Sequence, residues 1–230
     1  MGATGRKPFR SASESRSEVE ARLMATLGFL RRDFEVFAIE GFSARLAKID
    51  ELINPRLKRL GNELAPELSR TLRMEFFPHV AKHMRRTANP PAETWVAFGP
   101  SRTGYKRHGY LALCISAAGI HARAVVKTDA DQRPEMAQAI KSKSADLEKS
   151  FSGTKIQQYQ NWDCRELPRS IAAAAVFFDG LADALARKSG GIDVGFGWPV
   201  RDALTVDRAE VFDAFRELEP LYRVLCSVAS

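Results

Sequence analysis

Apolar and polar positions alternate along three neighbouring segments in the middle of the chain. The segments are residues 94–98, 110–116 and 120–127. Alternation with a period of two, in segments rich in β-branched and aromatic residues, indicates strands. The turn at residues 117–119 is too short for a parallel crossover. The pattern therefore predicts a three-stranded antiparallel meander.

Ahead of the meander, apolar residues recur three or four positions apart, which indicates helices. Three such segments are residues 17–32, 43–53 and 65–74. Asn54 and Pro55 mark the start of another helix, with Asn54 as its N-cap and proline in its first turn. We expect Gly61 to weaken or end that helix. Residues 33–39 alternate weakly and predict a short strand.

C-terminal to the meander, segments with the alternation of strands and segments with the spacing of helices both occur. Helices are predicted over residues 135–150, 168–186 and 208–227, and strands over residues 155–162 and 192–199. Ser-Gly-Gly at residues 189–191 is a typical signal for the end of a helix. Asp207, with Glu210 three residues later, forms a capping box that opens the last helix.

These elements predict one α+β domain over residues 18–230, in which an antiparallel sheet packs with helices. A chain of 230 residues is long enough for a substantial core, and its 45% apolar and 27% charged residues are ordinary for a globular protein. Residues 1–17 are rich in Gly, Ser and Arg, so we expect them to form a disordered basic arm.

The net charge of +7 favours anionic partners, but it does not choose between nucleic acid, phosphorylated small molecules and an anionic membrane surface. The three cysteines lie far apart in sequence, which indicates packing residues in a reducing cytosol. No segment approaches the roughly 20 apolar residues of a membrane-spanning helix, and the N-terminus lacks the apolar stretch of a secretory signal. The sequence therefore predicts a cytoplasmic protein without membrane insertion.

The candidate chemistry gathers in residues 76–110, which hold three of the four histidines. We expect a helix over residues 75–86, on which basic side chains at positions i, i+3, i+4 and i+7 share one face. These are His79, Lys82, His83 and Arg86. Pro-Pro at residues 90–91 ends that helix, and a flexible turn at residues 99–104 follows the next strand. We expect the basic helix and this loop to converge on one pocket.

Two long stretches carry a resemblance to a known family. Residues 33–61 read DFEVFAIEGFSARLAKIDELINPRLKRLG, and residues 79–106 read HVAKHMRRTANPPAETWVAFGPSRTGYK. Together they resemble the bacterial YktB family, also called UPF0637 or DUF1054. The resemblance implies a compact α+β domain and no known activity. Family members have Pro-His-Phe where this chain reads Arg-His-Gly-Tyr at residues 107–110, so the rim of a site there is expected to differ.

Our leading interpretation is a site for an anionic ligand that carries a phosphate or a carboxylate. Basic and polar side chains of this stretch are suited to such a group, and two adjacent arginines favour bidentate contacts. The predicted ligand-binding residues are His79, Lys82, His83, Arg85, Arg86, Asn89, Trp95, Arg102, Tyr105 and Lys106. The opposing interpretation is a solvated basic face whose long side chains lie over apolar surface.

Two further functions stay open as alternatives. One is an enzyme that acts on a phosphorylated or nucleotide substrate with His79 or His83 as its acid or base. The other is a nucleic-acid-binding protein that uses the basic arm and aromatic stacking, although no established recognition motif is present. We predict no metal site, because Val80 stands where a zinc peptidase has glutamate and Lys82 would repel a cation. The sequence specifies no cofactor.

Overall fold

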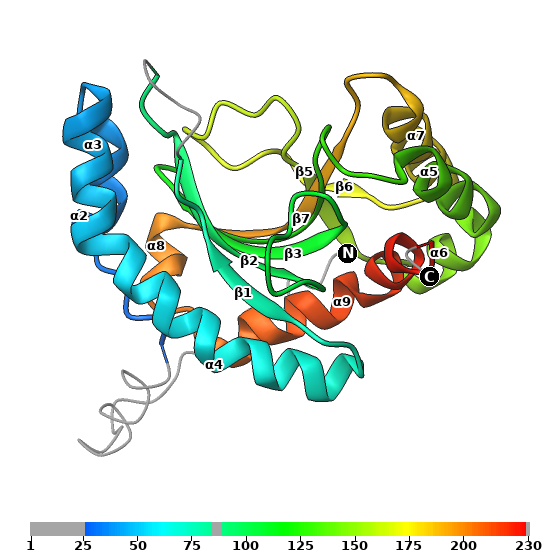
Figure 1. Ribbon diagram of the computed structural model, residues 1–230, viewed down its shortest axis with the longest axis horizontal. Helices are drawn as coiled ribbons and strands as arrows, with labels where there is room; N and C mark the ends of the chain where they lie inside the picture. The colour runs from blue at the N-terminus through cyan, green and yellow to red at the C-terminus, as the bar shows by residue number, and fades with distance from the viewer. Residues whose placement is uncertain (1–25, 84–88, 229–230) are drawn as a thin grey trace, which may run out of the picture.

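The computed structural model describes residues 26–83 and 89–228 of the protein. Through its centre runs a seven-stranded sheet in the order β1-β2-β3-β4-β7-β5-β6, and neighbouring strands are antiparallel (Figure 1). The strands are β1 Phe77–Val80, β2 Glu93–Gly99, β3 Tyr110–Ser116, β4 Gly119–Val126, β5 Lys155–Gln158, β6 Ile171–Ala172 and β7 Ile192–Pro199. The predicted α+β architecture, including the β2-β3-β4 meander, is confirmed.

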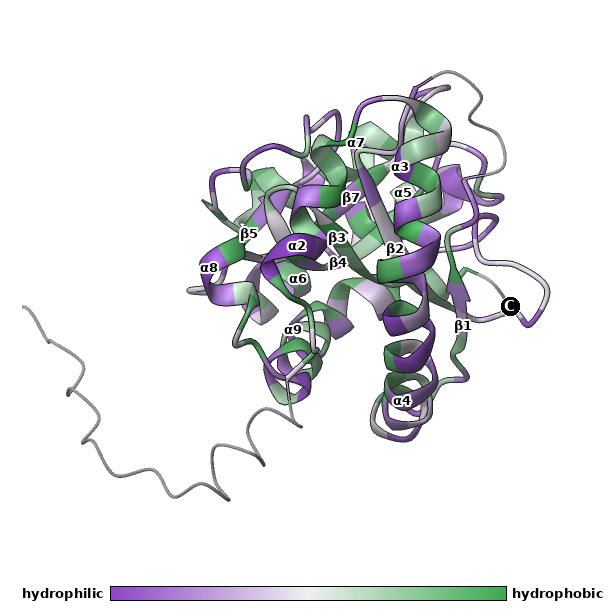
Figure 2. Cartoon of the chain, turned by 90° about the vertical axis from the view of Figure 1, so that its left-hand side faces the viewer, coloured by the Kyte–Doolittle hydropathy of each residue, from purple (hydrophilic) through white to green (hydrophobic). Residues whose placement is uncertain are grey.

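Helices pack on one face of this sheet. The two long helices α4 and α9 lie beneath the strands in Figure 1, and α5, α6 and α7 stand at one end. The helices are α2 Arg31–Glu35, α3 Phe42–Lys48, α4 Asn54–Leu72, α5 Arg133–Ser142, α6 Ser144–Ser150, α7 Ala175–Ala186, α8 Val200–Ala203 and α9 Arg208–Cys226. In Figure 2, α4 carries both hydrophilic and hydrophobic residues, as expected for a helix with one buried face.

The two faces of the sheet differ in composition. Side chains that point to the helices are apolar, such as Val96, Leu113 and Ile120, and they belong to the main core. The opposite face carries a smaller cluster around Tyr110 and Cys114, together with buried polar residues. We call this opposite face the polar face. The candidate chemistry lies there.

The N-terminal elements differ from the predictions. Residues 33–39 form α2 and a 3-10 turn, Val36–Ala38, where we expected a strand. The carboxylate of Asp33 accepts a hydrogen bond from the Leu30 N–H at 2.7 Å, which starts helical structure at that point. Residues 26–30 are not helical, because Leu27 pairs with Val206 instead. Of the helix predicted over residues 17–32, only residues 31–32 are helical, as the start of α2. Residues 17–25 and the basic arm lie outside the described residues.

Helix α4 is longer than the sequence indicates. It runs uninterrupted past Gly61 and Pro66, where we predicted two helices. Gly61 is needed because α4 crosses the sheet edge here: a Cβ on it would lie 2.9 Å from Val96 Cγ2 and 3.0 Å from Pro78 Cβ. Asn54 is also not an N-cap, because α4 continues directly from a π-helical turn, Ile49–Ile53.

The most consequential difference concerns residues 75–86, where a basic helix was predicted. The chain instead leaves α4 at Arg73, which has a left-handed φ of 52°, and forms the edge strand β1. Pro78 has no N–H to donate, which suits an edge strand. His79, Lys82 and His83 therefore do not share a helical face.

The C-terminal half agrees better with the predicted pattern. Strand β7 and helix α9 have nearly the predicted bounds, and the capping box of Asp207 and Glu210 is present. The helix predicted over residues 168–186 begins only at Ala175, because the preceding residues include the short strand β6. The predicted strand over residues 155–162 ends at Gln158.

Candidate functional site

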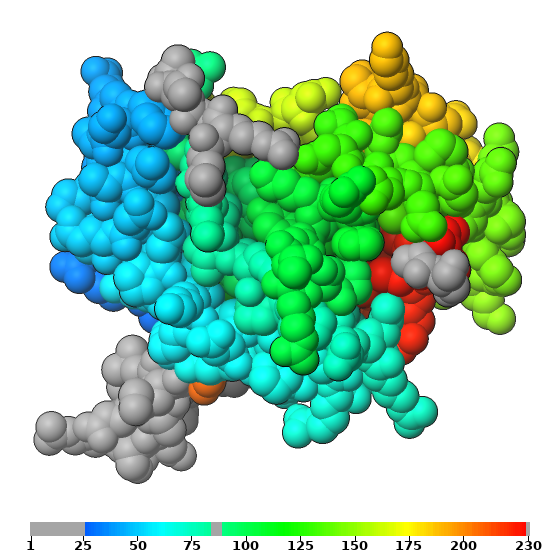
Figure 3. Space-filling view, in the orientation of Figure 1, coloured from blue at the N-terminus to red at the C-terminus, as the bar shows by residue number. Residues whose placement is uncertain are grey.

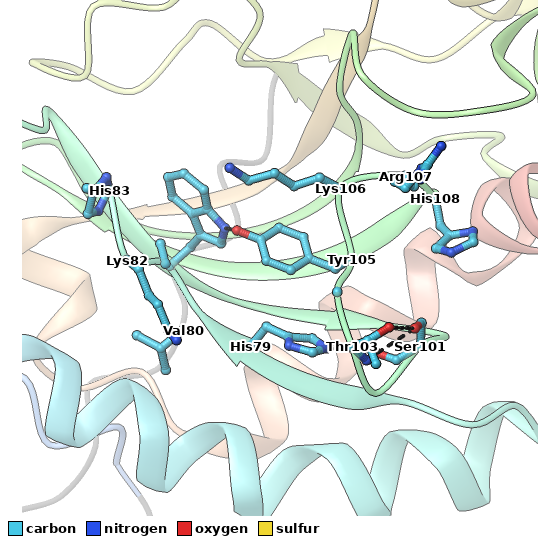
Figure 4. A pocket seen from close by; sticks show the side chains of 13 residues that line it. His79, Val80, Lys82, His83, Ser101, Thr103, Tyr105, Lys106, Arg107 and His108 are labelled. Atoms are coloured by element: carbon cyan, nitrogen blue, oxygen red, sulfur yellow. Dashed lines mark hydrogen bonds between the residues drawn. The ribbon is translucent and has the colours of Figure 1, made fainter. Parts of the chain in front are cut away.

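An open cavity of about 860 Å³ lies between the end of β1 and the loop that connects β2 to β3 (Figure 4). Atoms in the colour of this loop lie at the centre of the face that Figure 3 shows, so the region is at the surface. The residues that line it are His79, Val80, Ala81, Lys82, His83, Trp95, Ser101, Thr103, Gly104, Tyr105, Lys106, Arg107 and His108.

His79 is fixed at the floor of this cavity. Its register partner is Ala97, so its side chain points to the polar face. Nε2 lies 2.8 Å from the carbonyl oxygen of Ser101. A carbonyl only accepts, so Nε2 carries the hydrogen and donates it. Among the described residues, Nδ1 has no hydrogen-bond partner and stays available to a ligand.

Tyr105 folds from the loop back onto the sheet. A Cβ at Gly99 would lie 2.8 Å from Tyr105 Cβ, so the glycine permits this close approach. The phenol oxygen accepts a hydrogen bond of 3.1 Å from the indole N–H of Trp95. Burial raises the pKa of Tyr105 to about 12. The phenol is therefore a neutral donor at physiological pH.

His83 holds the other side of Trp95. The backbone of His83 has a φ of 49°, which turns the chain away from the strand direction. The imidazole Nε2 lies 3.1 Å from Thr94 Oγ1, and its ring meets the indole of Trp95 at an interplanar angle of 85°. Contacts on two sides thus fix the orientation of the indole.

The charge at the cavity is one-sided. Lys82, Lys106 and Arg107 are exposed at its rim, and no aspartate or glutamate is among the described residues that line it. Arg107 pairs with Asp131 at 2.9 Å, but both side chains are exposed. Lys82 and Lys106 form no ion pair with any described residue. In Figure 4, Lys106 reaches from the loop toward the side where His83 lies, whereas the side chain of Lys82 points past Val80 toward α4.

The predicted ligand-binding residues divide into three groups. His79, Lys82, His83, Trp95, Tyr105 and Lys106 line the cavity. Arg102 does not line it, because its guanidinium lies 4.6 Å over the ring of Phe77, and Asn89 is exposed elsewhere. Arg85 and Arg86 lie outside the described residues. The sequence interpretation missed Ser101 and Thr103, although both belong to the predicted flexible turn.

A second cavity of about 780 Å³ lies on the other side of β1, against α4. It shares His79 and Lys82 with the first cavity, but it also contains the carboxylate of Asp50. Lys82 therefore borders both cavities. The one-sided charge is a property of the first cavity.

A buried ionic cluster on the polar face was also missed. Arg123 is 2% exposed and forms ion pairs with Glu93 of β2 and Asp193 of β7. Its guanidinium lies 4.7 Å from the ring centre of Tyr159. Burial alone would lower the pKa of Arg123, but Asp193, Cys114 and Glu93 together raise it well above its usual value. The sequence signal was an arginine between alanines in an apolar strand.

The described residues contain no group of three or more histidine, cysteine or acidic side chains suited to hold a metal ion. The same part of the chain contains no helix that is both long enough and apolar enough to cross a membrane. The acid–base role suggested for His79 and His83 stays a prediction.

Comparison with known proteins identifies relatives along most of the chain. Residues 29–222 match the model of a family described as Domain of unknown function (DUF1054). A UPF0637 protein of Bacillus velezensis is 35% identical over 130 residues, which are 56% of this chain and 62% of that protein. A UPF0637 protein of Lysinibacillus sphaericus is 45% identical over 83 residues, 36% of this chain and 39% of that protein. The chain thus spans less than two thirds of the length of these relatives.

Proposed function

The chain belongs to the DUF1054 family, and for this member we propose that the cavity between β1 and the β2-β3 loop binds an anionic small molecule bearing a phosphate or a carboxylate. The observation that carries the proposal is the one-sided charge of the cavity. In the part of the chain that the structure describes, its lining includes one arginine, three histidines and two lysines without ion pairs, and no acidic side chain. Positive side chains around a hollow concentrate anions there.

Fixed donors support the same proposal. The Tyr105 phenol is neutral, and its oxygen already accepts from Trp95, so its own hydrogen remains available for donation. Ser101 and Thr103, whose hydroxyl oxygens lie 3.1 Å apart, add hydroxyl groups beside His79. An oxyanion in the cavity would therefore meet neutral donors close to the sheet and flexible cations at the rim.

Binding of pyrophosphate, measured by isothermal titration calorimetry, tests the proposal. We expect wild-type protein to bind it, and Lys82→Ala/Lys106→Ala to lose at least about tenfold in affinity, because charge-assisted contacts contribute roughly 1.5–3 kcal/mol each. Lys141→Ala/Lys149→Ala is the matched control, since it removes the same charge from exposed positions on α5 and α6. Equal losses in both variants would show that net charge, and not this cavity, attracts the anion.

Acid–base catalysis by His79 on a bound phosphate ester is the alternative function. It is favoured by the hydrogen bond to Ser101, which fixes one ring nitrogen as a donor and leaves the other to exchange a proton. Turnover of phosphate esters that survives in His79→Gln would exclude it.

A further inference from the structure

The size of the cavity indicates more than a simple anion. Its volume of about 860 Å³ lies within the range of roughly 300–1,000 Å³ that is usual for sites of organic ligands. A lone phosphate or carboxylate would leave most of this space filled by water. The ligand that fits therefore has an organic body as well as its charged group.

Trp95 indicates the nature of that body. Its side chain lines the cavity and is half-buried, so part of the indole surface is accessible there. The indole N–H is already donated to Tyr105, which leaves mainly the aromatic carbon surface for a ligand. A flat apolar surface of this kind favours stacking of a planar ring.

The indole is also held in place before any ligand arrives. The Tyr105 hydroxyl accepts a hydrogen bond from the indole N–H. Tyr105 is itself packed edge-on against Tyr110, with ring centres 4.7 Å apart. His83 meets the indole at 85° and is tied to Thr94. Because the platform is preorganised, stacking costs little side-chain entropy.

We propose that the ligand is a nucleotide, whose base stacks on Trp95 and whose phosphate is held by Lys106 at the rim of the cavity. This inference rests on the proposed function and specifies its ligand class. Sugar phosphates lack a planar body, and neutral nucleosides lack the charge. A nucleotide combines both properties with the size of the cavity.

Calorimetry with ribose 5-phosphate, adenosine, adenosine monophosphate and uridine monophosphate tests this assignment. We expect both mononucleotides to bind about tenfold to hundredfold tighter than ribose 5-phosphate, which is the usual gain from stacking one base on an aromatic side chain. Trp95→Leu should remove that gain and leave the affinity for ribose 5-phosphate within about threefold of wild type. Trp95→Phe should keep most of the gain, and it also tests the platform if the leucine variant unfolds.

The outcomes separate the two proposals. If mononucleotides and ribose 5-phosphate bind equally well, the nucleotide assignment fails and the anion site stands. If neither these compounds nor pyrophosphate bind, the anion site fails as well. A single-stranded tetranucleotide that binds more than about tenfold tighter than the mononucleotides would overturn the free nucleotide as the ligand and assign the platform to a nucleic-acid strand.

Discussion

Buried polar side chains inside β4 distinguish the polar face from an ordinary core. His121 is fully buried, with its Nε2 2.9 Å from Ser116 Oγ and its ring packed against Tyr159 and Trp162. Its Nδ1 has no hydrogen-bond partner among residues 26–83 and 89–228. Burial lowers the pKa of His121 well below its usual value, and the positive charge of Arg123 lowers it further. The native protein therefore holds this imidazole neutral.

This histidine predicts acid sensitivity. In the unfolded chain it takes up a proton near pH 6.5, whereas in the native protein it stays neutral, so stability is lost as the pH falls below about 6.5. Between pH 6.5 and 5 we expect the contribution of His121 to the free energy of unfolding to fall by up to about 1.4 kcal/mol per pH unit. Urea unfolding at a series of pH values measures the slope. In His121→Gln, whose amide can donate to or accept from Ser116, the slope should be smaller by this amount. Equal slopes in the two proteins would contradict the assignment.

Residue chemistry was easier to predict than residue position. Six of the ten predicted ligand-binding residues line the cavity, because basic and aromatic side chains are dense in that stretch. The reason given for their convergence was wrong, since spacing on a helix does not apply to β1. The cluster around Arg123 depends on the strand order β2-β3-β4-β7, which brings Glu93 and Asp193 to Arg123 from segments distant in sequence.

Segments with strong local signals were predicted well, and those decided by tertiary pairing were not. The bounds of β3 and β7 follow their alternation, and α9 follows its capping box. Strand β1 has only four residues, too few for a periodic signal, and it exists because β2 offers a pairing edge. Packing against β1 and β2 also explains the length of α4, because Gly61 allows close approach to Val96 and Pro78 and does not end the helix.

Gly61 in α4 and Gly180 in α7 give a matched pair of helical glycines. Alanine in place of an exposed helical glycine usually stabilises by roughly 0.5–1 kcal/mol, and nothing lies within 4 Å of a Cβ at Gly180. At Gly61 the added carbon would lie 2.9 Å from Val96 Cγ2, so we expect Gly61→Ala to destabilise by about 1–3 kcal/mol. Urea denaturation of both variants measures the two changes. Stabilisation by Gly61→Ala would show that α4 shifts away from the sheet without cost.

The molecule as a whole is asymmetric across its sheet. One face is covered by α4, α9 and the helices at one end, and it holds most of the apolar core. The polar face has a small apolar cluster and is covered by loops, with Arg123 linking β2 to β7 beneath Tyr159. A buried ion pair adds little net stability compared with apolar packing, but removal of one partner leaves a buried charge uncompensated. The cluster should therefore act as a unit.

Arg123→Met tests that unit. The substitution leaves Asp193 and Glu93 without their shared partner, so we expect a loss of about 3–5 kcal/mol in the free energy of unfolding. Lys127 also lies 3.3 Å from Asp193 in the wild-type structure. Adding Glu93→Gln and Asp193→Asn removes the stranded charges and should restore part of that stability.

Arg216→Met on α9 is the control for Arg123→Met, since it breaks an exposed ion pair with Asp213 and should cost less than about 1 kcal/mol. Chemical denaturation of wild type, both single variants and the triple variant compares the four proteins. A loss at Arg123 no larger than that at Arg216 would mean that water reaches the two carboxylates. In that case the polar face would be a hydrated surface and not a second core. Such a result would leave the cavity at Trp95 intact, because its residues contact one another through β1, β2 and the loop.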